Sequence, residues 1–375
     1  MKPVRVGLIG TGYMGKAHAI AFKSAPAIFP LSTDIVCEMV AEVDAELAAQ
    51  KAREFGFNRF TADWRQLVTD PEIDVVDICA PNYLHKEMAL AAIEAGKHVY
   101  SEKPLALSAI DALEMTEAAE KAGVKTLVGF NYTKNPTIQL AREIISNGEI
   151  GDVVHFRGTF NEDYLADNQL PFTWRLKREF SGSGTLGDMG SHLINLAEFL
   201  VAPMTELCAD IQTVHRERPT PDQPGNTGTV ENDDQVHLMA RFANGAMGTL
   251  ESSRIAWGRK NGLWFEVTGT RGSLIYDQER LSELQLFTND DRPSRQGFRR
   301  ILTGPQHPDY ANFCVSAGHG LGYNDMKAVE VRDLIEGIAA DKPMWPDFRA
   351  AYRVNVIMDA IEQSHAEHQW IQISV

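Results

Sequence analysis

The sequence predicts an α/β fold in which a doubly wound parallel sheet is followed by an α+β domain with an open, mostly antiparallel sheet. Up to about residue 130, short apolar runs alternate with helical segments, which is typical of parallel strands joined by helices. Beyond that point, extended runs follow one another with short turns between them, which favours antiparallel pairing. With 375 residues the chain has room for two domains, which we expect at 1–130 and 131–375.

The composition is that of a globular protein, and its charge excludes several kinds of partner. Hydrophobic residues make up 44% of the chain and charged residues 23%. The formal net charge of −15 argues against nucleic acid and against an anionic membrane surface, because both attract basic proteins. The sequence shows neither an apolar run of about 18 residues nor a signal segment at its start. We therefore expect a soluble, cytoplasmic protein.

The four cysteines, Cys37, Cys79, Cys208 and Cys314, are far apart in the sequence and form no C-x-x-C motif. Cys37 and Cys79 lie in strand-like apolar segments, so buried free thiols are expected there. The spacing supports neither a disulfide framework nor a zinc site, and no metal is expected.

The first domain is predicted to contain six strands and five helices. The expected strands are 6–9, 35–43, 58–61, 73–80, 98–101 and 125–129. The expected helices are 16–24, 45–55, 63–68, 84–95 and 108–122. Ser108 is a suitable N-cap for the last of these helices, and Gly96 and Gly123 are suitable stops for the last two.

A glycine motif joins the first strand to the first helix. Residues 10–15 read GTGYMG, which is G-x-G-x-x-G in the strand, turn and helix context of a dinucleotide-binding Rossmann domain. Gly10 permits the tight turn, Gly12 lets the backbone approach a pyrophosphate, and Gly15 lets the helix pack closely on the strand. The free N–H groups at the start of the helix then face the phosphates. A glycine-rich turn without a ligand is the alternative for the motif taken alone.

The second strand ends in acidic residues, which the dinucleotide-binding unit requires. Glu42 and Asp44 both stand at this end, and a carboxylate there accepts hydrogen bonds from the adenosine ribose. Such a carboxylate also repels a 2′-phosphate, so the cofactor is expected to be NAD. We favour Glu42 as the ribose ligand, although position alone does not separate it from Asp44.

The second domain is predicted to be richer in extended segments. A helix at 136–146 and a strand at 152–160 come first, and a further helix is expected at 188–200. The extended runs that follow are 205–214, 232–242, 246–257, 262–269 and 272–277, with a hairpin turn at Asn244–Gly245. Irregular segments are expected at 215–231, 288–300 and 303–324. The chain then ends with helices at 325–340 and 349–366 and a short strand at 370–375, and the helix at 349–366 is expected to pack back on the first domain.

Two positions carry the chemistry expected of an active site. Asp188 and His192 are four residues apart and share a helix face, so the carboxylate can orient the imidazole as a general base, and Asn195 continues the same stripe. A structural ion pair is the commoner meaning of such a spacing, and a metal site lacks a third ligand. Lys103 follows a strand end and precedes Pro104, where its ammonium can favour the alkoxide of a substrate hydroxyl. A solvated surface lysine is the alternative.

Taken together, these motifs resemble the glucose–fructose oxidoreductase / inositol dehydrogenase family (Gfo/Idh/MocA). The stretches that carry the resemblance are GLIGTGYMGKAH at 7–18, APNYLH at 80–85, SEKPLA at 101–106 and GTLGDMGSHLINL at 184–196. It extends over nearly the full length, because EVTGTRGSL at 266–274 and the final helix also fit.

The resemblance implies roles for individual residues. Lys103, Asp188 and His192 would be the catalytic residues, with His192 taking the hydroxyl proton. The cofactor-binding residues would be Gly10, Gly12, Tyr13, Met14, Gly15, Glu42, Asn82, His85 and Glu102. The expected substrate-binding residues are Asn131, Trp174, Arg175, Arg178, Asn195 and His319, of which Arg175, Arg178 and His319 have ordinary surface positions as their alternative. The family often has an acid in place of Asn195 and an arginine near 133–134, so these departures weaken any transfer of a particular substrate.

The leading functional hypothesis is an NAD-dependent dehydrogenase that oxidises a secondary hydroxyl of a cyclic polyol or sugar, such as scyllo- or myo-inositol or an aldose. The segment 172–178 and the loop 303–324 resemble the branch that acts on inositols and related sugars. The alternatives are a glycoside hydrolase that retains NAD and a non-catalytic dinucleotide sensor. The resemblance also implies a homodimer or homotetramer.

Overall fold

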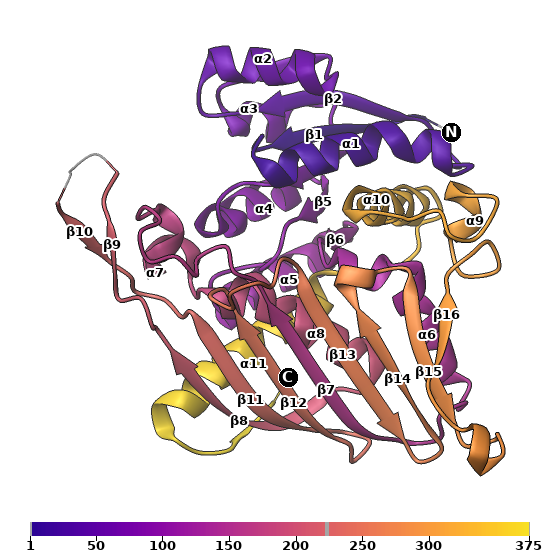
Figure 1. Ribbon diagram of the computed structural model, residues 1–375. Helices are drawn as coiled ribbons and strands as arrows, with labels where there is room; N and C mark the ends of the chain where they lie inside the picture. Colours follow the sequence, from indigo (N-terminus) through magenta and orange to yellow (C-terminus); the bar gives the residue numbers. More distant parts are fainter. Residues whose placement is uncertain (1, 222–224, 375) are drawn as a thin grey trace. The chain divides into compact units, whose positions relative to one another are not determined.

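The structure is a computed structural model that describes residues 2–221 and 225–374, and the chain divides into two compact units (Figure 1). Unit 1 comprises Met1–Lys134 and Gly322–Asn355, and unit 2 comprises Asn135–Leu321 and Val356–Val375. The sequence places 322–355 in the second domain, whereas these residues group with the first because a long helix within them packs against the first helix of the chain.

Unit 1 is built on a six-stranded sheet in which every pairing is parallel. Its strands are β1 (Val4–Ile9), β2 (Ile35–Ala41), β3 (Arg59–Thr61), β4 (Val75–Ile78), β5 (His98–Ser101) and β6 (Thr126–Val128). The order β3-β2-β1-β4-β5-β6 confirms the predicted doubly wound sheet. The direction of winding reverses between β1 and β4, and ligands of such sheets bind beyond the carboxyl ends of the strands at this point.

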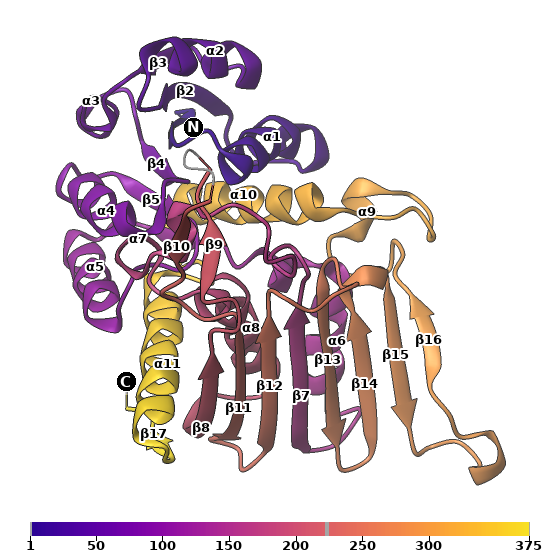
Figure 2. The same cartoon turned by 60° about the vertical axis from the view of Figure 1, so that its left-hand side comes forward.

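Helices pack on both faces of this sheet. They are α1 (Tyr13–Ile28), α2 (Ala45–Phe55), α3 (Trp64–Thr69), α4 (His85–Glu94), α5 (Ala109–Ala122) and α10 (Tyr323–Ala339), with 3-10 turns η1 (Asn82–Leu84) and η2 (Asn131–Lys134). In Figure 2, α1 and α10 lie on one face, and α4 and α5 lie on the other. Ser108 caps α5 as expected, and Gly96 and Gly123 follow α4 and α5 with positive φ.

Helix α1 is longer than the sequence predicts. The prediction ends it at Ser24 and makes the segment around Pro26 irregular, but the helix continues to Ile28 with Pro26 inside its last turn. A proline near the end of a helix removes few backbone hydrogen bonds. The burial of Ala25 and Phe29, together with the bond from Phe29 N to Ala25 O at 2.8 Å, stabilises the extra turn.

Unit 2 contains a nine-stranded sheet in the order β16-β15-β14-β13-β7-β12-β11-β8-β17. Its strands are β7 (Val153–Asn161), β8 (Met204–Gln212), β11 (Gln235–Phe242), β12 (Met247–Ser253), β13 (Gly262–Gly269), β14 (Gly272–Asp277), β15 (Glu283–Thr288), β16 (Arg299–Leu302) and β17 (Ile371–Gln372). Within this sheet β7 pairs with β12 in parallel and the other pairings are antiparallel, which confirms the predicted mostly antiparallel sheet. Asn244–Gly245 forms the β11–β12 hairpin turn, and Gly245 has a φ of 86°.

The segment predicted to be irregular at 215–231 contains a short hairpin of β9 (Glu217–Pro219) and β10 (Thr227–Thr229). Residues 222–224 of that segment, and Val375 at the end of the predicted last strand, lie outside the described residues.

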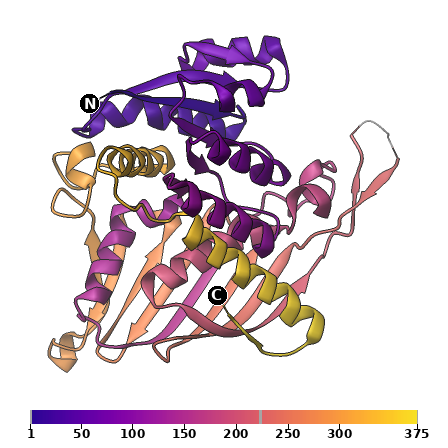
Figure 3. The ribbon, with the colours of Figure 1, turned by 180° about the vertical axis from the view of Figure 1, so that it is seen from behind.

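Three longer helices pack on one face of the unit 2 sheet. The helices of unit 2 are α6 (Pro136–Ser146), α7 (Arg178–Ser181), α8 (Ser191–Leu200), α9 (Tyr310–Phe313) and the greater part of α11 (Phe348–Glu367), whose first residues group with unit 1; its short turns are η3 (Trp174–Leu176), η4 (Leu186–Gly190), η5 (Gln278–Arg280) and η6 (Pro293–Arg295). Figures 1 and 3 show α6, α8 and α11 on the same side. Burial alternates along β11, where Val236 and Leu238 are buried and His237 and Met239 are exposed, so the opposite face is open. Over the described ranges, no helix is both long and apolar enough to cross a membrane.

A buried cluster of charges lies in unit 1. His18 of α1 faces Asp77 of β4 through Nδ1 at 2.9 Å and Glu102, which follows β5, through Nε2 at 2.9 Å. Lys327 of α10 lies 2.6 Å from Glu102 and 2.9 Å from Glu330. Because both ring nitrogens of His18 face carboxylates, both must donate, and the ring is an imidazolium.

The same contacts set the pKa values in the cluster. Burial lowers the pKa of His18, but the charge of Asp77, the nearby Cys79 and the Asp77 hydrogen bond together outweigh it, and the pKa lies well above the usual value. Burial also opposes the ionisation of Glu102, yet the Lys327 charge and the His18 hydrogen bond hold its pKa well below the usual range. The cluster is therefore charged at neutral pH.

This pKa shift predicts how the stability of the protein depends on pH. A raised His18 pKa adds stability that is complete below about pH 6.5, the unfolded value, and is lost as the pH rises through the folded value. Three other histidines have a lowered pKa, so they change the stability with pH only below about pH 6.5. They are His85, His98 and His155. The free energy of unfolding should thus fall by up to about 1.4 kcal/mol per pH unit as the pH rises above about 6.5.

Urea unfolding followed by circular dichroism at several pH values measures this slope. In the His18→Gln variant the slope should disappear, and an equal slope in both proteins would contradict the assignment of an imidazolium.

Candidate active site

The glycine turn between β1 and α1 has the geometry that a dinucleotide requires. Gly10 has a φ of 91°, and a Cβ atom there would lie 2.6 Å from the Cys79 carbonyl oxygen. A Cβ atom on Gly15 would lie 2.1 Å from the Gly10 carbonyl oxygen, so only glycine lets α1 approach the turn. At Gly12, the N-cap of α1, no described atom comes within 4 Å of a built Cβ. This open backbone at a helix N-terminus fits a pyrophosphate.

The structure separates the roles of Glu42 and Asp44. The Glu42 carboxylate accepts hydrogen bonds from Thr11 N at 3.1 Å and Thr11 Oγ1 at 2.6 Å, which places it beside the glycine turn. Asp44 instead caps α2 by accepting from Leu47 N at 2.8 Å. Glu42 is therefore the residue whose place matches the ribose ligand of the prediction.

Lys103 belongs to a short segment that is held on both sides. Before it, Glu102 Oε2 accepts the Lys103 backbone N–H at 3.2 Å. After it, His85 Nδ1 lies 2.9 Å from the Pro104 carbonyl oxygen, and His85 Nε2 lies 2.9 Å from that of Ala80. The sequence expects Glu102 and His85 to line the cofactor. In the structure both side chains form hydrogen bonds with the backbone around Lys103. Their contact with a cofactor stays a prediction.

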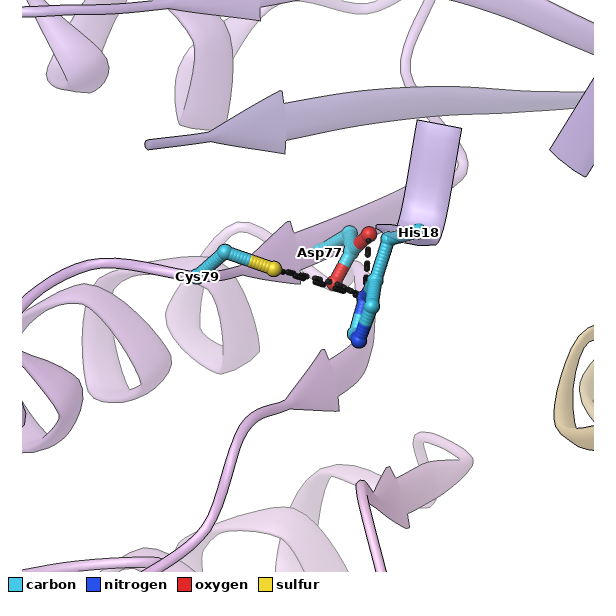
Figure 4. A group of neighbouring side chains, drawn as sticks. All are labelled: His18, Asp77 and Cys79. Carbon is cyan, nitrogen blue, oxygen red and sulfur yellow. Dashed lines mark hydrogen bonds and ion pairs between the residues drawn. The ribbon is translucent and has the colours of Figure 1, made fainter. Parts of the chain in front are cut away.

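A possible metal site also lies in unit 1. His18, Asp77 and Cys79 bring their ligand atoms within 4.8 Å of one another (Figure 4). The distance from His18 Nδ1 to Asp77 Oδ1, 2.9 Å, is that of a hydrogen bond, and a protonated imidazole cannot bind a metal ion. Burial raises the pKa of the Cys79 thiol to about 12, whereas metals bind the thiolate. The chemistry of these three residues favours the ion pair over a metal.

Other predicted ligands in unit 1 lie near the same strand ends. Asn82 begins η1, shortly after β4, and Asn131 begins η2, shortly after β6. The Asn131 side chain is fully buried, and neither of its amide atoms has a hydrogen-bond partner among the described residues. Tyr13 is 73% exposed beside the glycine turn, and Met14 Sδ accepts from Tyr323 OH at 3.4 Å.

In unit 2, the start of the helix that carries His192 is fixed by an aspartate. Asp233 accepts the backbone N–H of Gly184 at 2.6 Å and that of Leu186 at 2.7 Å. A Cβ atom on Gly184 would lie 2.0 Å from the Asp233 carbonyl oxygen, which explains the glycine. The sequence predicts an α-helix from Asp188, but residues 186–190 form a π-helical turn and α8 begins at Ser191. Such turns are frequent at functional sites.

The predicted catalytic pair lies on this turn and helix. Asp188 is half-buried in the π-helical turn, and His192 is 6% exposed in α8 with its ring 6.2 Å from that of Phe160. Asn195, one turn further along α8, is 3% exposed, and its Oδ1 has no hydrogen-bond partner in the described parts of the chain.

Sequence reasoning missed one residue of this site. The Tyr164 hydroxyl donates to Asp188 Oδ2 at 2.9 Å from the irregular segment after β7. Burial and the charge of Asp188 raise the pKa of Tyr164 well above its usual value, so its hydroxyl stays protonated and is a donor at neutral pH. Nothing in the sequence marks Tyr164, because its distance from Asp188 along the chain follows no helical or strand period.

The remaining predicted substrate contacts lie elsewhere in unit 2. The Arg175 guanidinium stacks on the Trp174 ring at 4.6 Å. Arg178 pairs with Glu362 of α11, and both line a cavity of about 700 Å³ whose lining contains neither Asp188 nor His192. His319 is exposed and binds Ser316, with Nδ1 3.1 Å from its carbonyl oxygen. The structure supplies structural roles for the two arginines, so their contact with substrate stays a prediction.

Comparisons with known proteins agree with this arrangement. Residues 4–130 match the model of the oxidoreductase family with an NAD-binding Rossmann fold, and residues 138–275 match the GFO/IDH/MocA C-terminal domain. The chain is 40% identical to levoglucosan dehydrogenase of Pseudarthrobacter phenanthrenivorans over 100% of this chain and 99% of that protein. It is 28% identical to myo-inositol 2-dehydrogenase of Thermotoga maritima, over 78% of this chain and 81% of that one.

The fold also matches a solved structure over its whole length. Levoglucosan dehydrogenase in complex with NADH and levoglucosan superposes with a TM-score of 0.97 at 41% identity, and 100% of each chain is covered. Together with the family models, these likenesses establish that the chain belongs to the GFO/IDH/MocA family of oxidoreductases and is an NAD-dependent oxidoreductase.

Proposed function

We propose that this protein is an NAD-dependent dehydrogenase that oxidises a secondary hydroxyl of a cyclic sugar, with the anhydrosugar levoglucosan as the first substrate to test. The observation that supports this most is the likeness to levoglucosan dehydrogenase over the full length of both chains. Inositols are the second candidate, because the identity to myo-inositol 2-dehydrogenase is lower and covers less of the chain.

The cofactor-binding residues follow from unit 1. Gly10, Gly12 and Gly15 would cradle the pyrophosphate, and Glu42 would hold the adenosine ribose, for which its place beside Thr11 is the support. NAD, when bound, accepts a hydride from the carbon that carries the hydroxyl. The contacts of Tyr13, Met14, Asn82, His85 and Glu102 with the cofactor belong to the same proposal.

The proton transfer follows from Lys103, Asp188 and His192. His192 would accept the hydroxyl proton, and Asp188 would orient the imidazole and stabilise the cation that forms. The Lys103 ammonium would donate to the same oxygen and favour its alkoxide. Tyr164 would keep Asp188 in place, and the hydrogen bond between them supports this role.

Two buried amides support a polar ligand. Buried polar atoms almost always find a partner, and a bound molecule can supply one. Asn131 in unit 1 and Asn195 in unit 2 each have such unpaired atoms among the described residues. We propose both as ligands of substrate hydroxyls.

The open face of the large sheet supports the expected homodimer or homotetramer. Met239 and Met247 on this face are 47% and 50% exposed, and a groove of about 470 Å³ runs across β7, β8, β11 and β12. Exposed apolar side chains on a broad face mark interaction sites. We propose this face as the contact between subunits.

Activity on a panel of sugars tests the function directly. NADH absorbance should rise with levoglucosan, or failing that with myo- or scyllo-inositol.

The role of His192 is tested by removing its imidazole. The His192→Ala variant should lose roughly 10²–10⁴ in kcat, while the His368→Ala variant, changed at an exposed histidine, should stay active. Activity of His192→Ala near that of the unchanged protein would overturn the assignment of the base. Cleavage of glycosides without net NADH would favour the retained-cofactor hydrolase.

The role of Tyr164 is tested by removing its hydroxyl. Tyr164→Phe should lower kcat by about 10- to 100-fold, because hydrogen bonds to a charged group contribute about 1.5–3 kcal/mol and each 1.4 kcal/mol is about tenfold in rate. Tyr276→Phe is the matched control: Tyr276 accepts from Asn135 at 2.8 Å in the core of unit 2, so its loss should reduce stability and leave kcat intact. Equal kcat values for both variants would count against the role.

Glu42 should decide between the two nicotinamide dinucleotides. Its carboxylate repels a 2′-phosphate, so Glu42→Ser should improve kcat/KM with NADP by about tenfold or more and weaken it with NAD. Steady-state kinetics with each cofactor measure both effects. Unchanged selectivity would show that another residue binds the ribose.

A further inference from the structure

The strongest unexplained feature is the buried charge cluster of unit 1, because it lies directly beside the segment that carries Lys103. Glu102 is at its centre and is 4% exposed. One of its oxygens accepts hydrogen bonds from both His18 Nε2 and Lys327 Nζ, at 2.9 and 2.6 Å. Its other oxygen accepts the backbone N–H of Lys103 at 3.2 Å. The carboxylate is thus held on one side by two cations and holds Lys103 on the other.

Each cation is itself held in place. Asp77 binds His18 on the far side of the ring, as Figure 4 shows, and the ring stacks on Tyr100 with centroids 4.5 Å apart. Lys327 pairs with Glu330 at 2.9 Å, and Tyr100 donates to the same glutamate at 2.7 Å. The Glu102 carboxylate therefore has one orientation available to it.

The space around the carboxylate is equally restricted. A Cβ atom on Gly129 would lie 2.5 Å from Glu102 Oε1 and 2.9 Å from Lys327 Nζ. The glycine lets β6 end close to the ion pair. An alanine there would displace the carboxylate while leaving every charge in the cluster unchanged.

Stability alone does not require such a cluster, although its ion pairs contribute to it. Burying ions costs several kcal/mol each, and apolar groups of similar volume often replace a buried ion pair without loss. What the cluster does achieve is a fixed backbone at Lys103, because Glu102 holds its N–H and His85 holds the carbonyl of Pro104.

We infer that Glu102, with His18 and Lys327 as its anchors, is a positioning residue for Lys103. This inference rests on the proposed catalytic role of Lys103. The cluster connects the helix after the glycine turn, the ends of β4 and β5, and α10, so the place of the Lys103 backbone is set relative to the cofactor-binding turn within one unit. The long Lys103 side chain then starts from a fixed point, which limits where its ammonium can reach.

The test is the Glu102→Gln variant. Its amide keeps one acceptor oxygen for His18 and Lys327, so its NH2 group then faces the Lys103 N–H, and the hydrogen bond that holds Lys103 is lost. Because small misplacements of a reacting group can cost about 10²-fold in rate, kcat should fall by about that factor. The proposed contact of Glu102 with the cofactor predicts weaker NAD binding instead, so the dissociation constant for NAD, measured by fluorescence, separates the two roles: positioning of Lys103 predicts a much smaller change in this constant than in kcat. The primary deuterium isotope effect on kcat, with ring-deuterated levoglucosan, should rise as the chemical step becomes slower.

Glu38→Gln is the matched control. Glu38 is another buried glutamate of unit 1, and it binds Arg5 at 2.8 Å and Arg59 at 2.7 Å away from the Lys103 segment. Its loss should lower the unfolding midpoint while kcat and the isotope effect stay unchanged. A merely structural role for Glu102 predicts the same result in both variants, and that result would overturn the inference.

Gly129→Ala and Lys103→Met complete the set. Gly129→Ala keeps all charges and should lower kcat in the same direction, which keeps the test decisive even where Glu102→Gln does not fold. Lys103→Met should be nearly inactive. Full activity of Lys103→Met would overturn the catalytic role that the proposed function gives to Lys103. Should Lys103→Met be inactive while Glu102→Gln and Gly129→Ala keep full kcat, the positioning inference alone fails.

Discussion

The charge of the Glu102 carboxylate, enclosed in the protein interior, is the constraint on which unit 1 depends. A lone carboxylate in such a place would take up a proton, because burial disfavours the ionised form. It stays ionised because His18 from α1 and Lys327 from α10 both reach it. These partners come from distant parts of the sequence, and their shared contact with Glu102 adds to the packing of α10 on α1 that groups residues 322–355 with unit 1.

In unit 2 a carboxylate is also held by hydrogen-bond donors, but here the donors are backbone N–H groups. The first N–H groups of a helix have no partner within it. The Asp233 carboxylate accepts the N–H groups of Gly184 and Leu186 at the start of the π-helical turn. Its neighbour Asp234 accepts from the buried Arg254 at 2.9 Å, so the segment just before β11 that carries the two aspartates is anchored as well. The turn with Asp188 and the helix with His192 therefore begin from a rigid point.

Local chemistry made much of the fold predictable. The glycine motif, the strand and helix alternation and the hairpin turn at Asn244–Gly245 depend on neighbours in the chain, and each was found where the sequence places it. Predictions failed where distant packing outweighs local preference. Pro26 stays helical because buried apolar neighbours support the last turn of α1. Tyr164 reaches Asp188 only through the tertiary fold, so no spacing in the sequence reveals it.

The sequence by itself determined the family and the cofactor and singled out Lys103, Asp188 and His192 as the candidate catalytic residues, because motifs of this kind encode backbone geometry and chemistry within a few residues. Only the tertiary structure decided what surrounds them. In the tertiary structure, Glu102 and His85 form hydrogen bonds that hold the Lys103 segment, and Arg178 pairs with Glu362. The reason is physical: a buried charge must find an opposite charge or a donor, and which residue supplies it depends on how distant segments pack.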